Sequence, residues 1–225
     1  MSKHVIAIAV LLAVSGVPAA AQFAPPRDYV FKPAAPCIED KVRAAKPVRP
    51  SDARYAVCED QMALLAKALA EAKASGKLLL VTFGATWCPW CASLQRTLPG
   101  AALLGHKDTT LDYGAAFHHA EIGLSMVWKG KKAEIPSGEA TLKHVLAMAP
   151  GVKIRAIPFM AVLDPAKPGR VFARNTDDVA KADGSHDTAK FRALLLEARA
   201  YLAGEGSGPS EPNWFVRKWR RFWNG

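Results

Sequence analysis

Short uninterrupted apolar runs predict the strands of this chain. Residues 78–83 and 159–163 are such runs, and they suit strands that are covered on both faces of a sheet. Residues 117–124 are predicted as a third strand, and residues 170–174 as a fourth beside 159–163. The charged segment 129–132 is expected to be a solvated turn.

Apolar residues at helical spacing predict helices between these strands. Met62, Leu65 and Leu69 recur on one face of a helix expected over residues 58–75. A second helix is expected over 88–98. The alternation of strands and helices indicates an α/β chain.

Two further helices are predicted from residues that commonly precede or end a helix. Ser137 is expected to cap a helix that stops before Pro150. Asp187 is expected to cap another, which ends at Gly204. No internal repeat is visible along the chain.

The first twenty-one residues have the pattern of a secretory signal peptide. Lys3 precedes an apolar run over residues 5–14, and small residues end at Ala21. The run is short for a membrane-spanning helix, which favours cleavage. We therefore expect residues 1–21 to be removed near Ala21 and the chain to be exported to the periplasm.

The remaining chain divides by composition into three parts. Residues 22–57 are rich in proline and predict an extended arm. Residues 58–204 hold all the predicted helices and strands and are expected to form a single domain. Residues 205–225 are expected to form a linker and a basic, aromatic tail.

Charge and composition limit the classes of function. Lys and Arg outnumber Asp and Glu by 30 to 20, giving a net charge of +10, and half of the residues are hydrophobic. No nucleotide-binding glycine loop and no H-E-x-x-H zinc motif is present. Nucleic acid is not an expected partner, because the chain is predicted to be exported.

The segment W-C-P-W-C at residues 87–91 carries the clearest chemical signal. It lies between the predicted strand 78–83 and the helix expected from residue 88. Unsatisfied backbone N–H groups and the helix dipole would stabilise a thiolate at Cys88. A thiolate attacks disulfides, and Cys91, one turn along, can resolve the mixed disulfide.

The segment V-T-F-G-A-T-W-C-P-W-C at residues 81–91 resembles the active-site strand and helix start of the thioredoxin superfamily. Ile157-Pro158, before a second apolar strand, resembles the cis-proline that faces the two cysteines in that family. The order of elements fits from about residue 58 to 204, with insertions expected over 99–138. The resemblance implies a thioredoxin fold, with a central mixed sheet and helices on both faces.

The resemblance also implies the roles of the two cysteines. Cys88 would be the nucleophile and Cys91 the buried resolving thiol of a thiol-disulfide oxidoreductase. Its substrates would be thiols and disulfides of exported proteins, and a separate redox partner would reset the pair. No bound cofactor is implied, because the cysteines carry the electrons.

Five further residues are implied as the substrate-binding surface. Pro158 would shape a groove in which the Ile157 backbone pairs with an extended peptide. Trp87 would flank the site, and Pro89 and Trp90 would tune the cysteine pair.

One position departs from the family pattern. The family often has a buried acid on the strand before the motif, where this chain has Thr82. A threonine cannot accept the Cys91 proton as a carboxylate does, so a water or another side chain must act. The departure bears on the rate and the reducing strength, and not on disulfide exchange itself.

The other cysteines, Cys37 and Cys58, have two interpretations. A structural disulfide would tie the proline-rich arm to the first helix and stabilise the fold by roughly 3 kcal/mol. Alternatively, the two form a second redox pair that passes electrons to Cys88. The structural disulfide is the favoured prediction, because neither residue belongs to a C-x-x-C segment.

The histidines do not predict a metal site. His118 and His119 are adjacent on a predicted strand, so their side chains point to opposite faces. We interpret these and the scattered His106, His144 and His186 as surface or capping residues.

The tail at residues 213–225 combines aromatic and basic side chains. On a helix, Phe215, Trp219, Phe222 and Trp223 would gather on one side. Such a segment can lie on an anionic membrane surface, dock on the domain or bind a partner, and the sequence does not decide among these.

A second function from a different class stays open. The chain would then be a non-catalytic binding module that holds a peptide or a membrane surface. Replacement of the cysteines would distinguish this module from the oxidoreductase.

Overall fold

The computed structural model describes residues 29–30, 55–128 and 130–205. The predicted signal peptide at residues 1–21, most of the proline-rich segment with Cys37, and residues 213–225 lie outside the described residues. The predictions made for these segments, and the Cys37–Cys58 pairing, therefore stay predictions.

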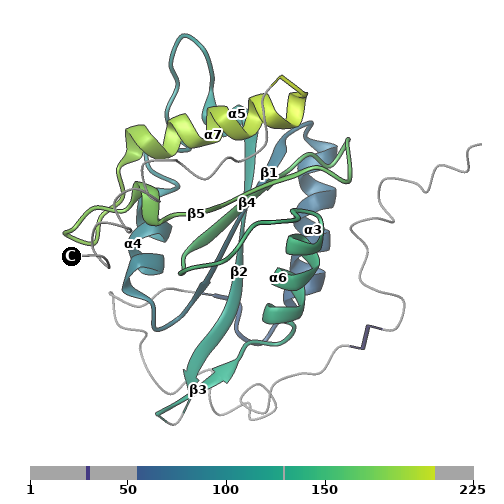
Figure 1. The fold of residues 1–225 in the computed structure, drawn as a ribbon, viewed down its shortest axis with the longest axis vertical. Coiled ribbons are helices and arrows are strands. Elements are labelled where there is room, and N and C mark those ends of the chain that lie inside the picture. Colours follow the sequence, from purple (N-terminus) through teal and green to yellow (C-terminus); the bar gives the residue numbers. More distant parts are fainter. Residues whose placement is uncertain (1–28, 31–54, 129, 206–225) are drawn as a thin grey trace, which may run out of the picture.

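A five-stranded mixed sheet forms the centre of the described chain (Figure 1). Its order is β3-β2-β1-β4-β5, with β1 and β2 parallel and the other neighbouring pairs antiparallel. The strands are β1 (Leu78–Ala85), β2 (Phe117–Trp128), β3 (Lys131–Glu134), β4 (Phe159–Leu163) and β5 (Val171–Asn175).

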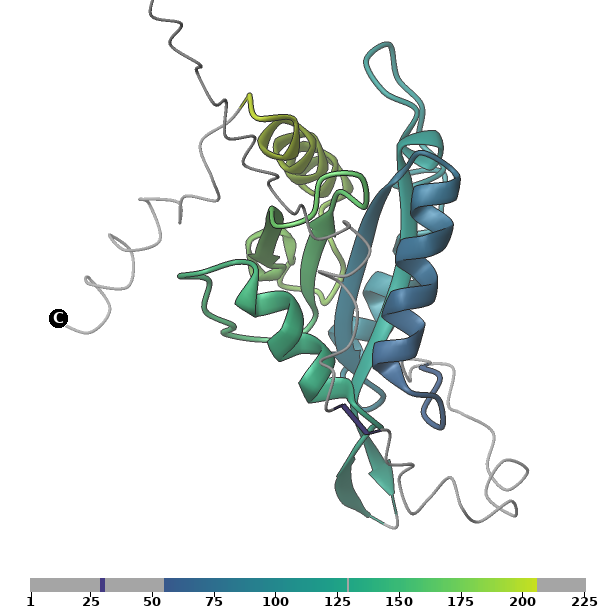
Figure 2. The same ribbon diagram turned by 90° about the vertical axis from the view of Figure 1, so that its right-hand side faces the viewer.

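Helices cover both faces of this sheet, as the α/β prediction requires. Helices α3 and α6 lie side by side, and the strands separate α3 from α7 (Figures 1 and 2). The helices are α3 (Gln61–Ala74), α4 (Pro89–Thr97), α5 (Tyr113–Ala116), α6 (Gly138–Ala147) and α7 (Thr188–Ala203), with a short 3₁₀ helix η2 (Asp177–Val179).

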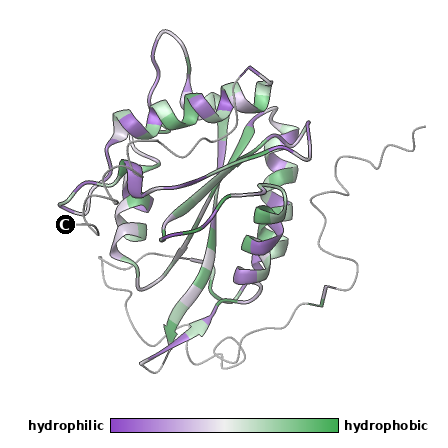
Figure 3. Cartoon of the chain, viewed as in Figure 1, coloured by the Kyte–Doolittle hydropathy of each residue, from purple (hydrophilic) through white to green (hydrophobic). Residues whose placement is uncertain are grey.

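The strands alternate their side chains between two cores. Leu79 and Phe83 of β1 pack with residues of α3 and α6, whereas Leu80 packs with residues of α4 and α7. Strands β1 and β4 are buried on both faces, which explains why their sequences are continuous apolar runs. Figure 3 shows this apolar centre and the more polar surfaces around it.

Most of the predicted elements are present, with shifts at their ends. The strand predicted at 159–163 has the same bounds as β4. The first helix begins at Gln61 rather than at residue 58, because Asp60 accepts hydrogen bonds from the N–H groups of Met62 and Ala63.

The solvated turn predicted at 129–132 is wrong in its second half. Lys131 and Lys132 belong to β3, which pairs with the end of β2. The side chains of β3 are mostly exposed because it is an edge strand, so its lysines carry no apolar signal.

The prediction for Ser137 is also wrong in part. Ser137 stands before α6, but its φ is 61° and its side chain makes no capping hydrogen bond. Its hydroxyl contacts the hydroxyl of Tyr29 instead, and Tyr29 also donates to Asp60 at 2.9 Å. Tyr29 thus connects the chain before α3 to the starts of α3 and α6.

None of the helices in the described part of the chain is long and apolar enough to cross a membrane.

Candidate functional site

The two motif cysteines lie where β1 ends and α4 begins. Cys88 is the residue before α4, and its N–H donates to the carbonyl of Ala85 at 3.1 Å. Pro89 follows in the first turn, where its missing N–H costs no helical hydrogen bond. A disulfide joins Cys88 to Cys91, with 5.2 Å between the two Cα atoms.

The backbone of α4 is arranged to stabilise charge on Cys88. The Cys91 N–H points at Cys88 Sγ, 3.1 Å away, and the positive end of the helix dipole lies at the same place. In the reduced protein, both features would lower the pKa of the Cys88 thiol. Cys88 and Cys91 are both buried, with exposed fractions of 3% and 1%.

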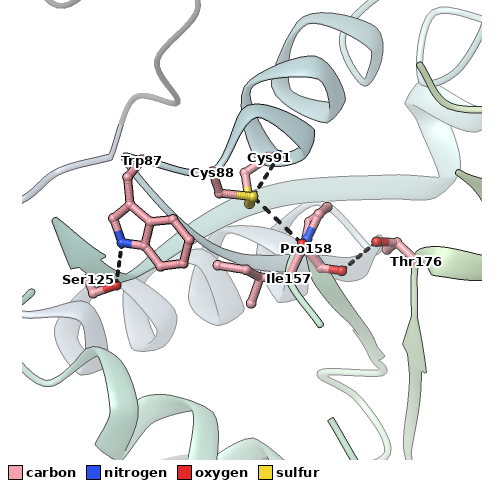
Figure 4. Close-up of a disulfide and its surroundings, with 7 residues drawn as sticks. All are labelled: Trp87, Cys88, Cys91, Ser125, Ile157, Pro158 and Thr176. Atoms are coloured by element: carbon pink, nitrogen blue, oxygen red, sulfur yellow. Dashed lines mark hydrogen bonds between the residues drawn. A yellow bond between two sulfur atoms is a disulfide. The ribbon is translucent and has the colours of Figure 1, made fainter. Parts of the chain in front are cut away.

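Ile157 and Pro158 face this disulfide from the start of β4 (Figure 4). Strand β4 runs antiparallel to β1, which brings its first residues to the end of β1 where the motif lies. The Ile157–Pro158 peptide bond is cis, and the Ile157 carbonyl oxygen lies 3.6 Å from Cys88 Sγ. Thr176 donates a hydrogen bond to the Pro158 carbonyl.

A pocket of about 370 Å³ opens beside Trp90 of the motif and the cis peptide bond, and neither Cys88 nor Cys91 lines it. Trp90, Ile157 and Pro158 line it, so three of the five predicted substrate-binding residues lie together. The other lining residues come from the loop after Lys153 and from the segment between β5 and α7: Ala156, Thr176, Asp177, Ala180, Lys181, Ala182 and His186.

The remaining two predicted substrate-binding residues lie elsewhere. Pro89 is exposed in the first turn of α4 and does not line the pocket. Trp87 is 39% exposed and turns toward β2, where its indole N–H donates to Ser125 Oγ at 3.0 Å (Figure 4). The ammonium of Lys132 lies 3.7 Å from the centre of the Trp87 ring.

His186 is a feature of the pocket that the sequence did not reveal. It is 4% exposed, and its ring meets that of Trp90 edge-on at 6.4 Å. Within the described part of the chain, neither of its ring nitrogens has a hydrogen-bond partner. Burial lowers the pKa of His186, so the ring is a neutral group with one free donor and one free acceptor.

Two paired glycines in β1 and β2 make room for a tyrosine. Gly84 of β1 and Gly123 of β2 are partners in the sheet. A Cβ on Gly84 would collide with the Tyr55 hydroxyl and lie 2.7 Å from Cys91 Sγ, and a Cβ on Gly123 would lie 2.9 Å from Tyr55 Cβ. The Tyr55 hydroxyl therefore lies close to the buried sulfur.

A buried glutamine holds the segment that carries this tyrosine. Gln61 Nε2 donates to the carbonyls of Ala56 and Glu59 at 2.8 and 2.9 Å. Its Oε1 accepts from the N–H of Gly123 at 2.8 Å. These bonds fix the chain after Tyr55 against β2.

An acid lies on the same face of the sheet as this tyrosine. Glu121 of β2 is the partner of Thr82, and Gln95 of α4 donates to its Oε2 at 2.7 Å. Burial raises the pKa of Glu121 to about 7, although the bond from Gln95 works in the opposite direction. Burial also raises the pKa of Tyr55, and the charge of Glu121 raises it further.

His119 completes this polar group, and its position corrects the interpretation as a surface or capping residue. Its Nε2 lies 3.0 Å from Thr82 Oγ1. Burial, with a smaller contribution from His118, lowers the pKa of His119 to about 4, so the ring is neutral at physiological pH. His118 points to the opposite face and lies 3.2 Å from Glu71, as the alternation of the strand predicts.

In the described ranges, no three His, Cys, Asp or Glu side chains converge to hold a metal ion.

Comparison with known proteins gives no match: no family model, no curated protein and no solved structure is significantly similar to this chain.

Proposed function

We propose that this chain is a thiol-disulfide oxidoreductase with a thioredoxin fold. The observation that carries the proposal is the disulfide between Cys88 and Cys91 at the start of α4, with the Ile157 carbonyl 3.6 Å from Cys88 Sγ. Two cysteines that close a disulfide within one helical turn can cycle between dithiol and disulfide.

In this proposal Cys88 attacks the substrate and Cys91 resolves the product. Cys88 has the helix N-terminus and the Cys91 N–H to stabilise its thiolate. Cys88 also lies nearest to the Ile157 carbonyl, where an extended peptide would bind as an added strand. Cys91, which is also buried, then attacks Cys88 and releases the substrate.

The pocket beside Trp90 and the cis peptide bond would receive a side chain of the substrate protein. Its Trp90 and Pro158 surfaces suit an apolar group. The substrates would be exported proteins, in keeping with the predicted signal peptide at 1–21, and a separate partner would reset the pair.

A mixed-disulfide experiment tests this function. C91S in the full chain should trap substrate proteins on Cys88 in a periplasmic extract, and the adducts should disappear on reduction. C88S should trap far fewer. If neither variant traps a protein, the oxidoreductase is excluded.

The pocket also supports the second candidate, a binding module that holds a peptide without redox chemistry. In that case C88S would still bind the same peptides as the unmodified chain, and neither cysteine variant would form a covalent adduct.

A further inference from the structure

Resolution of a mixed disulfide requires that Cys91 lose its proton inside the protein. Cys91 is 1% exposed, so bulk water has little access to its sulfur. Burial among apolar groups favours the neutral thiol over the thiolate. Thr82, on the strand before the motif, has a hydroxyl that bonds to His119 and no carboxylate.

We propose that Glu121, acting through the hydroxyl of Tyr55, accepts the proton of Cys91. This inference rests on the proposed thiol-disulfide exchange. The proton acceptor then lies on β2, the neighbour of β1, and β1 is the strand that leads into the motif.

Tyr55 supplies the contact with the sulfur. The position that a Cβ of Gly84 would occupy touches both the Tyr55 hydroxyl and Cys91 Sγ, so the two atoms are neighbours. Tyr55, Cys88 and Cys91 also belong to the same hydrophobic cluster. A hydroxyl can accept one proton while it donates another, which suits a relay.

Contacts with α4 and with β1 fix the position of Glu121. Gln95 follows Cys91 by one helical turn on α4 and donates to Glu121 Oε2 at 2.7 Å. Across the sheet, Glu121 is paired with Thr82, two residues before Gly84. Glu121 and Gly123 lie two residues apart on β2 and so point to the same face, and Tyr55 Cβ lies 2.9 Å from the position of a Gly123 Cβ, which makes Tyr55 a neighbour of Glu121. The charge of Glu121 also raises the pKa of Tyr55.

Glu121 is the best base among the titratable groups of this cluster. The groups that face it are Gln95 from α4, Tyr55 from the segment before α3, Thr82 from β1 and His119 from its own strand. His119 has a pKa of about 4 and is a weak base. Glu121 has a pKa of about 7, close to the pH at which it would work.

The proposed step consists of two proton transfers and one thiol-disulfide exchange. Cys91 Sγ gives its proton to Tyr55 Oη, and Tyr55 gives its own proton to a carboxylate oxygen of Glu121. The Cys91 thiolate attacks Cys88 Sγ; the Cys88–Cys91 bond forms and the bond between Cys88 and the substrate sulfur breaks. The substrate sulfur leaves with the electron pair and takes a proton from water. Over the cycle, the two cysteines lose two electrons and the substrate disulfide gains them.

The test is stopped-flow reduction of an aromatic disulfide, dithiobis(nitrobenzoic acid), by the reduced full chain. The first thiol is released when Cys88 attacks, and the second when Cys91 resolves the mixed disulfide. A C88A/C91A variant measures any release from Cys37 and Cys58, which is subtracted. The variants are E121Q, which keeps the shape and the acceptor for Gln95, and Y55F, which removes only the hydroxyl.

We expect E121Q to slow the second release about tenfold or more near pH 7 and to remove its pH dependence around that value. Y55F should slow the same phase, and E121D should restore part of the rate. The first release should stay unchanged, because Cys88 attacks without this acid, and the circular dichroism spectrum of each variant should match that of the unmodified chain. E134Q, which changes an exposed glutamate of β3, is the matched control and should behave as the unmodified chain does.

An unchanged second release in E121Q between about pH 5 and pH 9 would overturn the relay. Absence of a second release in the unmodified chain would overturn it too. A parallel assay with insulin separates this inference from the proposed function. If E121Q slows the second release but the unmodified chain neither reduces nor exchanges insulin disulfides, the proton relay is supported. The proposed activity on protein disulfides is then overturned.

Discussion

Thr82 and Glu121 are partners in the β1–β2 ladder, and the acid of the pair is on β2. A carboxyl group therefore lies beside α4, where Gln95 donates to it. In the proposed relay, this residue, almost forty positions later in the chain, takes the role that an acid at position 82 would have. The relay would then depend on this long-range pairing.

The free energy of unfolding should depend on pH through the titration of Glu121. Folding raises the pKa of this carboxyl from 4.5 to about 7, so the folded state keeps a proton that the unfolded state loses between these values. Its contribution to stability is complete below about pH 4.5 and is lost as the pH rises through about 7. E121Q, which never ionises, should be more stable than the unmodified chain at about pH 8, by on the order of 1–2 kcal/mol after allowance for partial exposure.

Urea denaturation of the oxidised proteins at a series of pH values measures this difference. His119 has the opposite dependence, because its lowered pKa makes it destabilising in acid, but both proteins contain it and its effect cancels. A stability difference that did not change with pH would show that Glu121 is not the titrating group.

Gly84 should tolerate no side chain. In G84A the new Cβ would meet the Tyr55 hydroxyl and Cys91 Sγ, and the disulfide prevents the sulfur from moving away. We expect a loss of about 1–3 kcal/mol in the free energy of unfolding, measured by urea denaturation. G100A is the control, because its Cβ would meet only one backbone oxygen, at 3.3 Å, and it should cost less. Equal losses in the two variants would be inconsistent with the packing described for Tyr55.

Thr176 should stabilise the start of β4. Its hydroxyl donates to the Pro158 carbonyl, and its side chain is buried. T176V leaves that carbonyl without its donor and should lower the free energy of unfolding by about 1–3 kcal/mol. The matched control is T97V, since Thr97 bonds to a carbonyl of its own helix, in part-buried surroundings. The prediction fails if T97V costs as much as T176V.

The bond from Gln95 should hold the pKa of Glu121 below the value that burial alone would give. Q95L removes the donor, so the pKa of Glu121 should rise above about 7. Carbon-13 NMR of the glutamate carboxyl groups across a pH titration measures this directly. T97V, on the same helix, should leave the titration where it was, and a fall of the pKa in Q95L would contradict the assignment.

The sequence was informative wherever the structure depends on local pattern. Strands β1 and β4 are apolar on both faces, and their continuous runs are visible without the fold. The spacing of Cys88 and Cys91 and the helix that begins between them are equally local, and the disulfide follows from them. Asp187 caps α7 as predicted, with its carboxylate accepting from the Lys190 N–H at 3.1 Å.

The surroundings of the cysteines could not be predicted because they come from distant segments. Tyr55 lies close to Cys91 because the glycines at 84 and 123 leave room for it, and Glu121 lies opposite Thr82 because β1 pairs with β2. His186 reaches Trp90 from the loop before α7. A strand position alone does not tell which of its polar residues is buried, so Glu121 and His119 resembled ordinary surface residues.

The central claim is that Cys88 and Cys91 form a redox-active pair, and its most direct test is equilibration of the chain in glutathione buffers of graded potential. The fraction of Cys88–Cys91 disulfide would be read by alkylation and mass spectrometry of the peptide that contains both residues. The account predicts a reversible two-electron transition between about −270 and −120 mV, the range of known exchange proteins. A disulfide that does not respond to any buffer in this range would be structural, and the account would be contradicted.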